Sequence, residues 1–302
     1  MSSNEHAARD RANAFRTEHD LGTRPLGDLF EFVHVALGCD ALAIDANEVE
    51  HGLSMLDPES DRIVIVVATT PHPMRQRSSL AHEIGHVVAN DLRAPTAPTP
   101  GSRSPAEIQA DAFARHLLLP LPALHERFSQ RVDEPDLVVQ GPEGSPRLLA
   151  QVKRTRPASI GEPELAAVVQ EFEVSPKLAA IQMKEAKLIR LRQCEEWGSL
   201  STGSLAARYG WLSQYQAMSL AATQPRAPQT LMRRAVEGYR RGVVGLTELA
   251  CWYGLPPEQL LERIGPPQEQ LSAGTTAERA DDLDEDTPLF PPGFGSRRMA
   301  DE

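Results

Sequence analysis

Cysteines are few, and none of them are paired at a spacing that signals a cross-link or a metal site. Cys39, Cys194 and Cys251 are far apart in the sequence and odd in number. No Cys-x-x-Cys pair occurs, so neither a disulfide framework nor a thiolate zinc site is indicated. We therefore expect the protein to work in a reducing compartment.

Long apolar segments are also missing. The first twenty residues are polar and charged, without the apolar stretch of a secretory signal. The longest apolar run, 63–68, is far too short to cross a bilayer. Together with the unpaired cysteines, this pattern predicts a cytoplasmic protein with no membrane partner.

Positive charge is scarce. Lys and Arg number 31 against 42 Asp and Glu, which gives a formal net charge of -11. General binders of nucleic acid or of anionic membranes need a dense positive field, so the overall charge argues against both classes. The 302 residues, 41% of them hydrophobic, are enough for two domains or for one enzyme domain with helical additions.

The first half of the chain alternates helical and strand-like patterns. Residues 1–24 are expected to form a charged leader, helical or frayed. Apolar residues at helical spacing over 26–37, ending at Gly38, predict a helix. A short strand is expected at 41–44 and a clear, β-branched one at 62–68. Helices are expected at 78–90 and at about 105–119, joined by a loop rich in Pro, Thr, Ser and Gly.

The second half is expected to be mainly helical. Residues 129–160 are an insertion or a hairpin, and 161–195 form a helical segment that resembles a helix-turn-helix. A helical C-terminal domain is expected over 196–270. The tail, 271–302, is acidic and rich in proline, a composition that predicts disorder.

The segment His82-Glu83-Ile84-Gly85-His86 lies within the expected helix 78–90. Residues four apart on a helix project from neighbouring positions, so two imidazoles at this spacing can bind one tetrahedral zinc ion. The apolar residues of the helix lie on another face, which leaves the histidines free to line a cleft. Glu83 lies between the two faces, where its carboxylate can take a proton from a water held by the metal. We therefore predict His82 and His86 as metal ligands and Glu83 as the catalytic base; the alternative is two histidines on an ordinary helix.

The next expected helix offers a third ligand. Glu107 and Asp111 share one face of it. Two histidines and Glu107 would leave the fourth zinc position open for water, as catalytic zinc sites do. Asp111 would accept a hydrogen bond from a ligand imidazole and so fix its tautomer. Ser104-x-x-Glu107 also fits a capping box, so a structural role for Glu107 stays open at this point.

Two blocks of the sequence resemble the ImmA/IrrE family of metallopeptidases: RQRSSLAHEIGH at 75–86 and EIQADAFARHLLLP at 107–120. The resemblance covers about 25–125 and continues more weakly through 165–189. It implies a gluzincin-like fold and limited proteolysis of a partner, usually a helix-turn-helix repressor of stress or mobile-element genes. The family often has a second Glu where this chain has Gln109, and often Asn where it has Asp111.

The expected architecture is therefore α+β. A zincin-like metallopeptidase lobe, 25–128, holds a small β-sheet and the HExxH helix, and a mainly helical region follows it. Zn²⁺ is the expected cofactor, and Mn²⁺ is possible at a site of two imidazoles and a carboxylate.

Two other functions compete with peptidase activity. The helices around 164–190 could bind DNA, but their turn lacks the usual glycine and the second helix offers only Lys177, Lys184 and Lys187 for phosphate contacts. Direct DNA binding is therefore disfavoured. A metal-binding interaction module without turnover is the other alternative, and Glu83 argues against it because a structural zinc needs no base.

Overall fold

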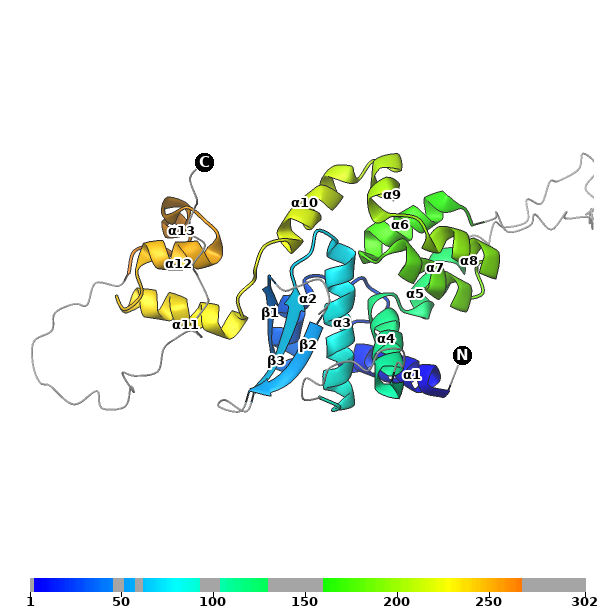
Figure 1. The fold of residues 1–302 in the computed structure, drawn as a ribbon, viewed down its shortest axis with the longest axis horizontal. Coiled ribbons are helices and arrows are strands. Elements are labelled where there is room, and N and C mark those ends of the chain that lie inside the picture. Colours follow the sequence, from blue (N-terminus) through cyan, green and yellow to red (C-terminus); the bar gives the residue numbers. More distant parts are fainter. Residues whose placement is uncertain (1–2, 46–51, 58–61, 93–103, 130–159, 268–302) are drawn as a thin grey trace, which may run out of the picture.

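The computed structural model describes residues 3–45, 52–57, 62–92, 104–129 and 160–267 (Figure 1). It is a mixed α+β protein with a three-stranded sheet and mostly helical content. The expected insertion at 129–160 and the expected disordered tail lie almost wholly outside these residues, as does most of the expected loop before Pro105. The elements of the first half are α1 (Ser3–Glu18), α2 (Leu29–Leu37), β1 (Asp40–Ile44), β2 (Gly52–Asp57), β3 (Arg62–Ala68), α3 (Pro73–Ala89), α4 (Pro105–Leu118) and α5 (Leu121–Ser129).

The sheet has the strand order β1-β3-β2. β1 runs parallel to β3, and β2 runs antiparallel to it, with Ser54 opposite Ile65. β3 is rich in β-branched residues, and its Ile65 and Val67 side chains are buried in the core. β1 and β3 form where the sequence predicts them, whereas β2 was not predicted, because Gly52-Leu-Ser-Met-Leu-Asp57 is poor in strand-favouring residues.

The outer edge of β1 is covered by a distant part of the chain. Arg226 and Ala43 exchange two backbone hydrogen bonds, each 2.9 Å long. The Arg226 guanidinium donates to both carboxylate oxygens of Asp28, at 3.0 and 2.6 Å, and lies 4.4 Å above the Phe30 ring. The other edge of the sheet belongs to β2, which pairs with no further strand among the described residues.

Helices stack on the sheet in successive layers (Figure 1). α3 packs against β2 and β3, α4 packs against α3, and α1 packs against α4. Ala8, Ala12 and Phe15 of α1 are buried in the common core. The expected leader is therefore helical, and it is part of the domain. Its small alanine side chains allow α1 to pack closely on α4, and this contact could not be predicted from residues 1–24 alone.

α3 carries the HExxH segment. It begins at Pro73, five residues before the expected Ser78, because Pro73 fits the first helical turn. It ends at Ala89 and is followed by Asn90, which caps the helix in the left-handed conformation with φ 54°. Leu80 and Ile84 are fully buried on its core side.

The described part of the second half, 160–267, is mainly helical, as predicted. α6 and α7 form the expected helix pair around 164–190, and Glu173 occupies the left-handed position of their turn with φ 51°. No helix of the described residues is both long and apolar enough for a bilayer span. The remaining elements are α6 (Glu162–Phe172), α7 (Pro176–Glu185), α8 (Leu191–Gly198), α9 (Thr202–Arg208), α10 (Leu212–Ala222), α11 (Gln229–Arg240), α12 (Leu246–Tyr253) and α13 (Pro257–Ile264).

Candidate metal centre

Two helices bring the three predicted ligands together. The Nε2 atoms of His82 and His86, on α3, lie 3.1 Å apart. Glu107, on α4, places one carboxylate oxygen 3.2 Å from His82 Nε2 and the other 3.5 Å from His86 Nε2. All three donor groups lie within 4.8 Å of one another, close enough to hold a metal ion. The structure thus brings together the three residues that the sequence analysis selected.

The beginning of α4 explains how Glu107 is free to reach the histidines. Ser104 caps the helix, accepting a hydrogen bond from the Glu107 backbone N–H at 3.3 Å. The Glu107 side chain points to the imidazoles instead of closing a capping box. Both interpretations of the Ser104-x-x-Glu107 spacing therefore hold in part: the serine is the cap, and the carboxylate belongs to the cluster.

Each histidine is fixed from behind by a carboxylate. His82 Nδ1 lies 2.9 Å from Asp111 Oδ1, which is the contact expected for Asp111. His86 Nδ1 lies 2.9 Å from Asp91 Oδ1, a contact that the sequence analysis missed. The sequence does hold a signal for Asp91, because Asn90 before it is a residue that often ends a helix in the left-handed conformation. There the chain turns back, and the Asp91 N–H donates to the His86 carbonyl.

These contacts determine which ring nitrogens carry protons. An ionised carboxylate only accepts hydrogen bonds, so each Nδ1 carries the hydrogen and each Nε2 presents a lone pair. Two lone pairs 3.1 Å apart, next to the Glu107 carboxylate, repel one another unless a cation lies between them. The cluster is therefore arranged around a positive charge.

The pKa of His82 reflects the same surplus of negative charge. Burial alone would lower it, but the hydrogen bond with Asp111 and the charges of Asp111, Glu83 and Glu107 together outweigh burial and raise the pKa. Without a metal, a proton is the cation that the site attracts.

Zinc fits the donor set. For ligand atoms about 2.0–2.1 Å from a tetrahedral ion, the separation between donors is about 3.3 Å. The separations here are 3.1, 3.2 and 3.5 Å. Two imidazoles and one carboxylate leave one tetrahedral position without a protein ligand, which is the pattern of catalytic sites.

Glu83 lies beside the cluster without belonging to it. Its side chain is buried, with 6% of its surface exposed, and accepts a hydrogen bond from Ser54 of β2. Burial raises the pKa of this carboxyl, although His82, Ser54 and His86 partly offset the effect. Gly52, also on β2, leaves the space that the carboxylate fills: a Cβ there would lie 2.9 Å from Glu83 Oε1. Two residues of β2, Gly52 and Ser54, thus position the Glu83 carboxylate.

A comparison with protein families finds a match for about half of the chain. Residues 36–184 match the model of peptidase family M78, described as the IrrE N-terminal-like domain. No curated protein matches the chain. The matched stretch contains the three clustered residues, Glu83 and both carboxylates behind the histidines, whereas α1 precedes it and α8–α13 follow it. Residues 36–184 therefore belong to peptidase family M78, the family of the IrrE N-terminal-like domain.

Proposed function

We propose that this protein is a zinc-dependent endopeptidase with a zincin-like catalytic lobe. His82, His86 and Glu107 hold the metal, and Glu83 is the catalytic base. The observation that carries the proposal is the convergence of three electron-rich donor atoms beside a buried carboxylate that is not one of them. Membership of a peptidase family supports the same assignment.

The metal and Glu83 have different roles in the proposed reaction. Zinc, when held by His82, His86 and Glu107, would supply the Lewis acidity that polarises a scissile carbonyl and makes water a better nucleophile near neutral pH. Glu83 accepts a proton from the attacking water and passes it to the amine that leaves. Its raised pKa suits both halves of this transfer, because a carboxyl that titrates closer to neutral pH can both take and return a proton. Manganese is a second candidate for the metal.

The open edge of β2 supports an extended substrate. Arg226 occupies the β1 edge, so β2 is the edge at which a peptide could add a strand among the described residues. Such a peptide would run past Gly52 and Ser54, the residues that contact Glu83. The proposed substrate is a helix-turn-helix repressor; this part rests on the family resemblance, and the same applies to a role in stress or mobile-element regulation.

The experiment compares wild-type protein with Glu83→Gln. Both are incubated with repressors encoded next to the gene, and the fragments are identified by mass spectrometry. We expect wild type to cut one of them at a defined bond and Glu83→Gln to lose cleavage while zinc stays bound. A metal-binding module without turnover would give no fragments with either protein, and equal cleavage by both would remove Glu83 from the mechanism.

A further inference from the structure

The last three helices form a unit with a small core of its own. Tyr239 of α11, Leu249 and Ala250 of α12, and Leu260 of α13 are buried together, separately from the main core. The unit stands at one side of the molecule and is joined to the body through the segment that covers β1 (Figure 1). It lies beyond the stretch that matches the peptidase family.

One face of α11 concentrates positive charge. Arg233, Arg234, Arg240 and Arg241, called the arginine face below, are all exposed. At about 100° per residue, the four project within roughly 120° around the helix axis and span about 12 Å along it. Glu237, which pairs with Arg241, is the acidic residue among them. The face therefore carries four positive charges and one negative charge in a chain whose net charge is -11.

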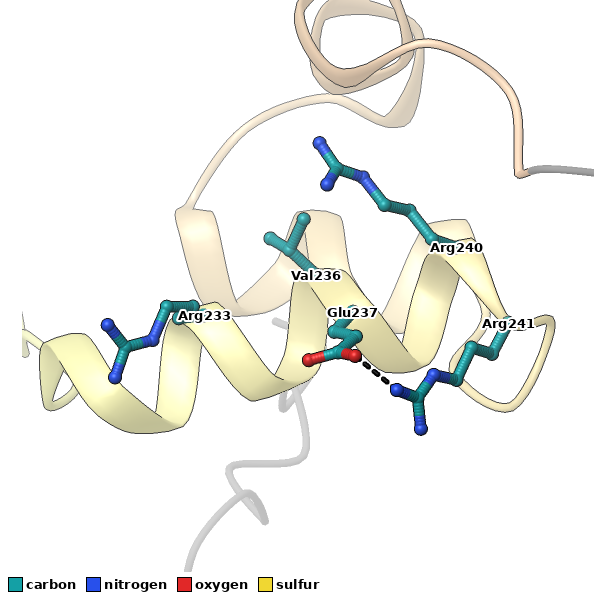
Figure 2. A pocket seen from close by; sticks show the side chains of 5 residues that line it. All are labelled: Arg233, Val236, Glu237, Arg240 and Arg241. Atoms are coloured by element: carbon teal, nitrogen blue, oxygen red, sulfur yellow. Dashed lines mark hydrogen bonds and ion pairs between the residues drawn. The ribbon is translucent and has the colours of Figure 1, made fainter.

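Among the described residues, three of the four arginines have no carboxylate partner and are available to bind a ligand. Figure 2 shows Arg233 toward one end of α11 and Arg240 and Arg241 at the other, with Glu237 between them. Together with Val236 they line a hollow of about 550 Å³. In the part of the chain that the structure describes, Arg233, Arg234 and Arg240 have no carboxylate partner, so most of the positive charge faces solvent.

We propose that the arginine face binds the phosphate backbone of nucleic acid, with duplex DNA as the partner. Guanidinium groups bind phosphate oxygens through two parallel hydrogen bonds, and a row of them matches a row of phosphates. A protein partner fits this face less well. Protein interfaces are built around desolvated apolar and aromatic anchors, and the five residues that line the hollow include one apolar residue, Val236, and no aromatic one.

This site differs from the helix pair 162–185, for which DNA binding was disfavoured. There the second helix and its end carry three isolated lysines; here four arginines share one face. The binding would be weak and insensitive to sequence, because phosphate contacts carry no base information. It would hold the peptidase near DNA-bound proteins, and it is independent of the metal site.

The test uses the full chain and a fluorescent duplex of about 20 base pairs, followed by anisotropy between about 50 and about 200 mM KCl. Four phosphate contacts predict a log–log slope of about −3 to −4. Arg233→Gln with Arg240→Gln should weaken binding and reduce the slope by about 2. Arg190→Gln with Arg192→Gln, two exposed arginines near the start of α8, makes the same change in net charge and should leave binding unchanged.

Three outcomes would overturn the proposal. The first is no binding of the duplex at the lowest salt concentration. The second is an equal loss of affinity in the two double variants, which would show an effect of net charge alone. The third is tighter binding of poly-glutamate than of DNA, which would assign the face to an acidic protein segment. All of the substituted side chains are exposed, and circular dichroism would verify that the variants are folded.

Discussion

Gly85 of α3 lies directly against Ala110 of α4. A Cβ built on Gly85 would be 3.2 Å from the Ala110 Cα and 3.2 Å from a ring carbon of Phe113. The absent side chain therefore sets how closely the two helices approach. Because the histidines and Glu107 are on these two helices, the Gly85–Ala110 contact also sets the separation of the three donor groups.

Gly85→Ala should disturb the metal centre. Alanine ordinarily stabilises a helix relative to glycine by roughly 0.5–1 kcal/mol. Here the added methyl group would meet the backbone of α4, so the substitution should destabilise the protein instead. We expect overpacking to lower the free energy of unfolding by about 1–3 kcal/mol. Zinc binding should also become weaker. Urea unfolding and a zinc-affinity titration measure the two effects. Gly198→Ala in α8, where a Cβ meets only Lys177 at 3.8 Å, is the control; a Gly85→Ala protein as stable and as tightly metal-bound as wild type would contradict the account.

Gly52→Ala should impair catalysis and spare the metal. The new Cβ would lie 2.9 Å from Glu83 Oε1 and 3.0 Å from its Cγ, so the carboxylate must move in a buried space. We expect kcat to fall tenfold or more, by analogy with small displacements of catalytic groups that cost up to about 100-fold. Zinc content should stay at the wild-type level. Gly27→Ala, where a Cβ meets nothing within 4 Å, should behave as wild type. Unchanged kcat in Gly52→Ala would show that Glu83 tolerates displacement.

Asp91→Ala should weaken zinc binding about as much as Asp111→Ala. Each carboxylate lies 2.9 Å from the Nδ1 of one histidine and fixes its tautomer. Loss of such a partner costs roughly 10- to 100-fold in metal affinity. Competition with a fluorescent chelator measures the change for both variants. If Asp91→Ala kept full affinity, the orientation of His86 would have to depend on other contacts.

As the pH is lowered, zinc affinity should begin to decline at a higher pH than it would if His82 had the pKa of an ordinary histidine. Zinc binds neutral His82, whose pKa in the metal-free protein is raised above the usual 6.5. As the pH falls through that raised pKa, His82 takes up a proton that competes with the metal. Asp111→Asn removes the hydrogen bond and the charge, so the decline should move to lower pH. Chelator competition between about pH 5.5 and about pH 8.5 locates both midpoints; a midpoint that Asp111→Asn leaves in place would contradict this explanation.

Local patterns predict the parts of the site that lie within single elements. The β-branched run of β3, the four-residue spacing of His82 and His86, and the shared face of Glu107 and Asp111 all follow from strand or helix periodicity. The missed features depend on contacts between distant segments. β2 is a strand because β3 pairs with it, and Asp91 reaches His86 only because Asn90 turns the chain back. The packing of α1 on α4 likewise cannot be deduced from its own charged sequence.

The central claim is that three side chains from two helices hold one divalent ion. The most direct test is the metal content of the purified full chain by mass spectrometry, after loading with zinc and removal of the excess. We predict one zinc per chain in the wild type and in Glu83→Gln, and loss of the zinc in Glu107→Gln. Zinc-free wild-type protein, or Glu107→Gln that keeps its full zinc content, would contradict the account.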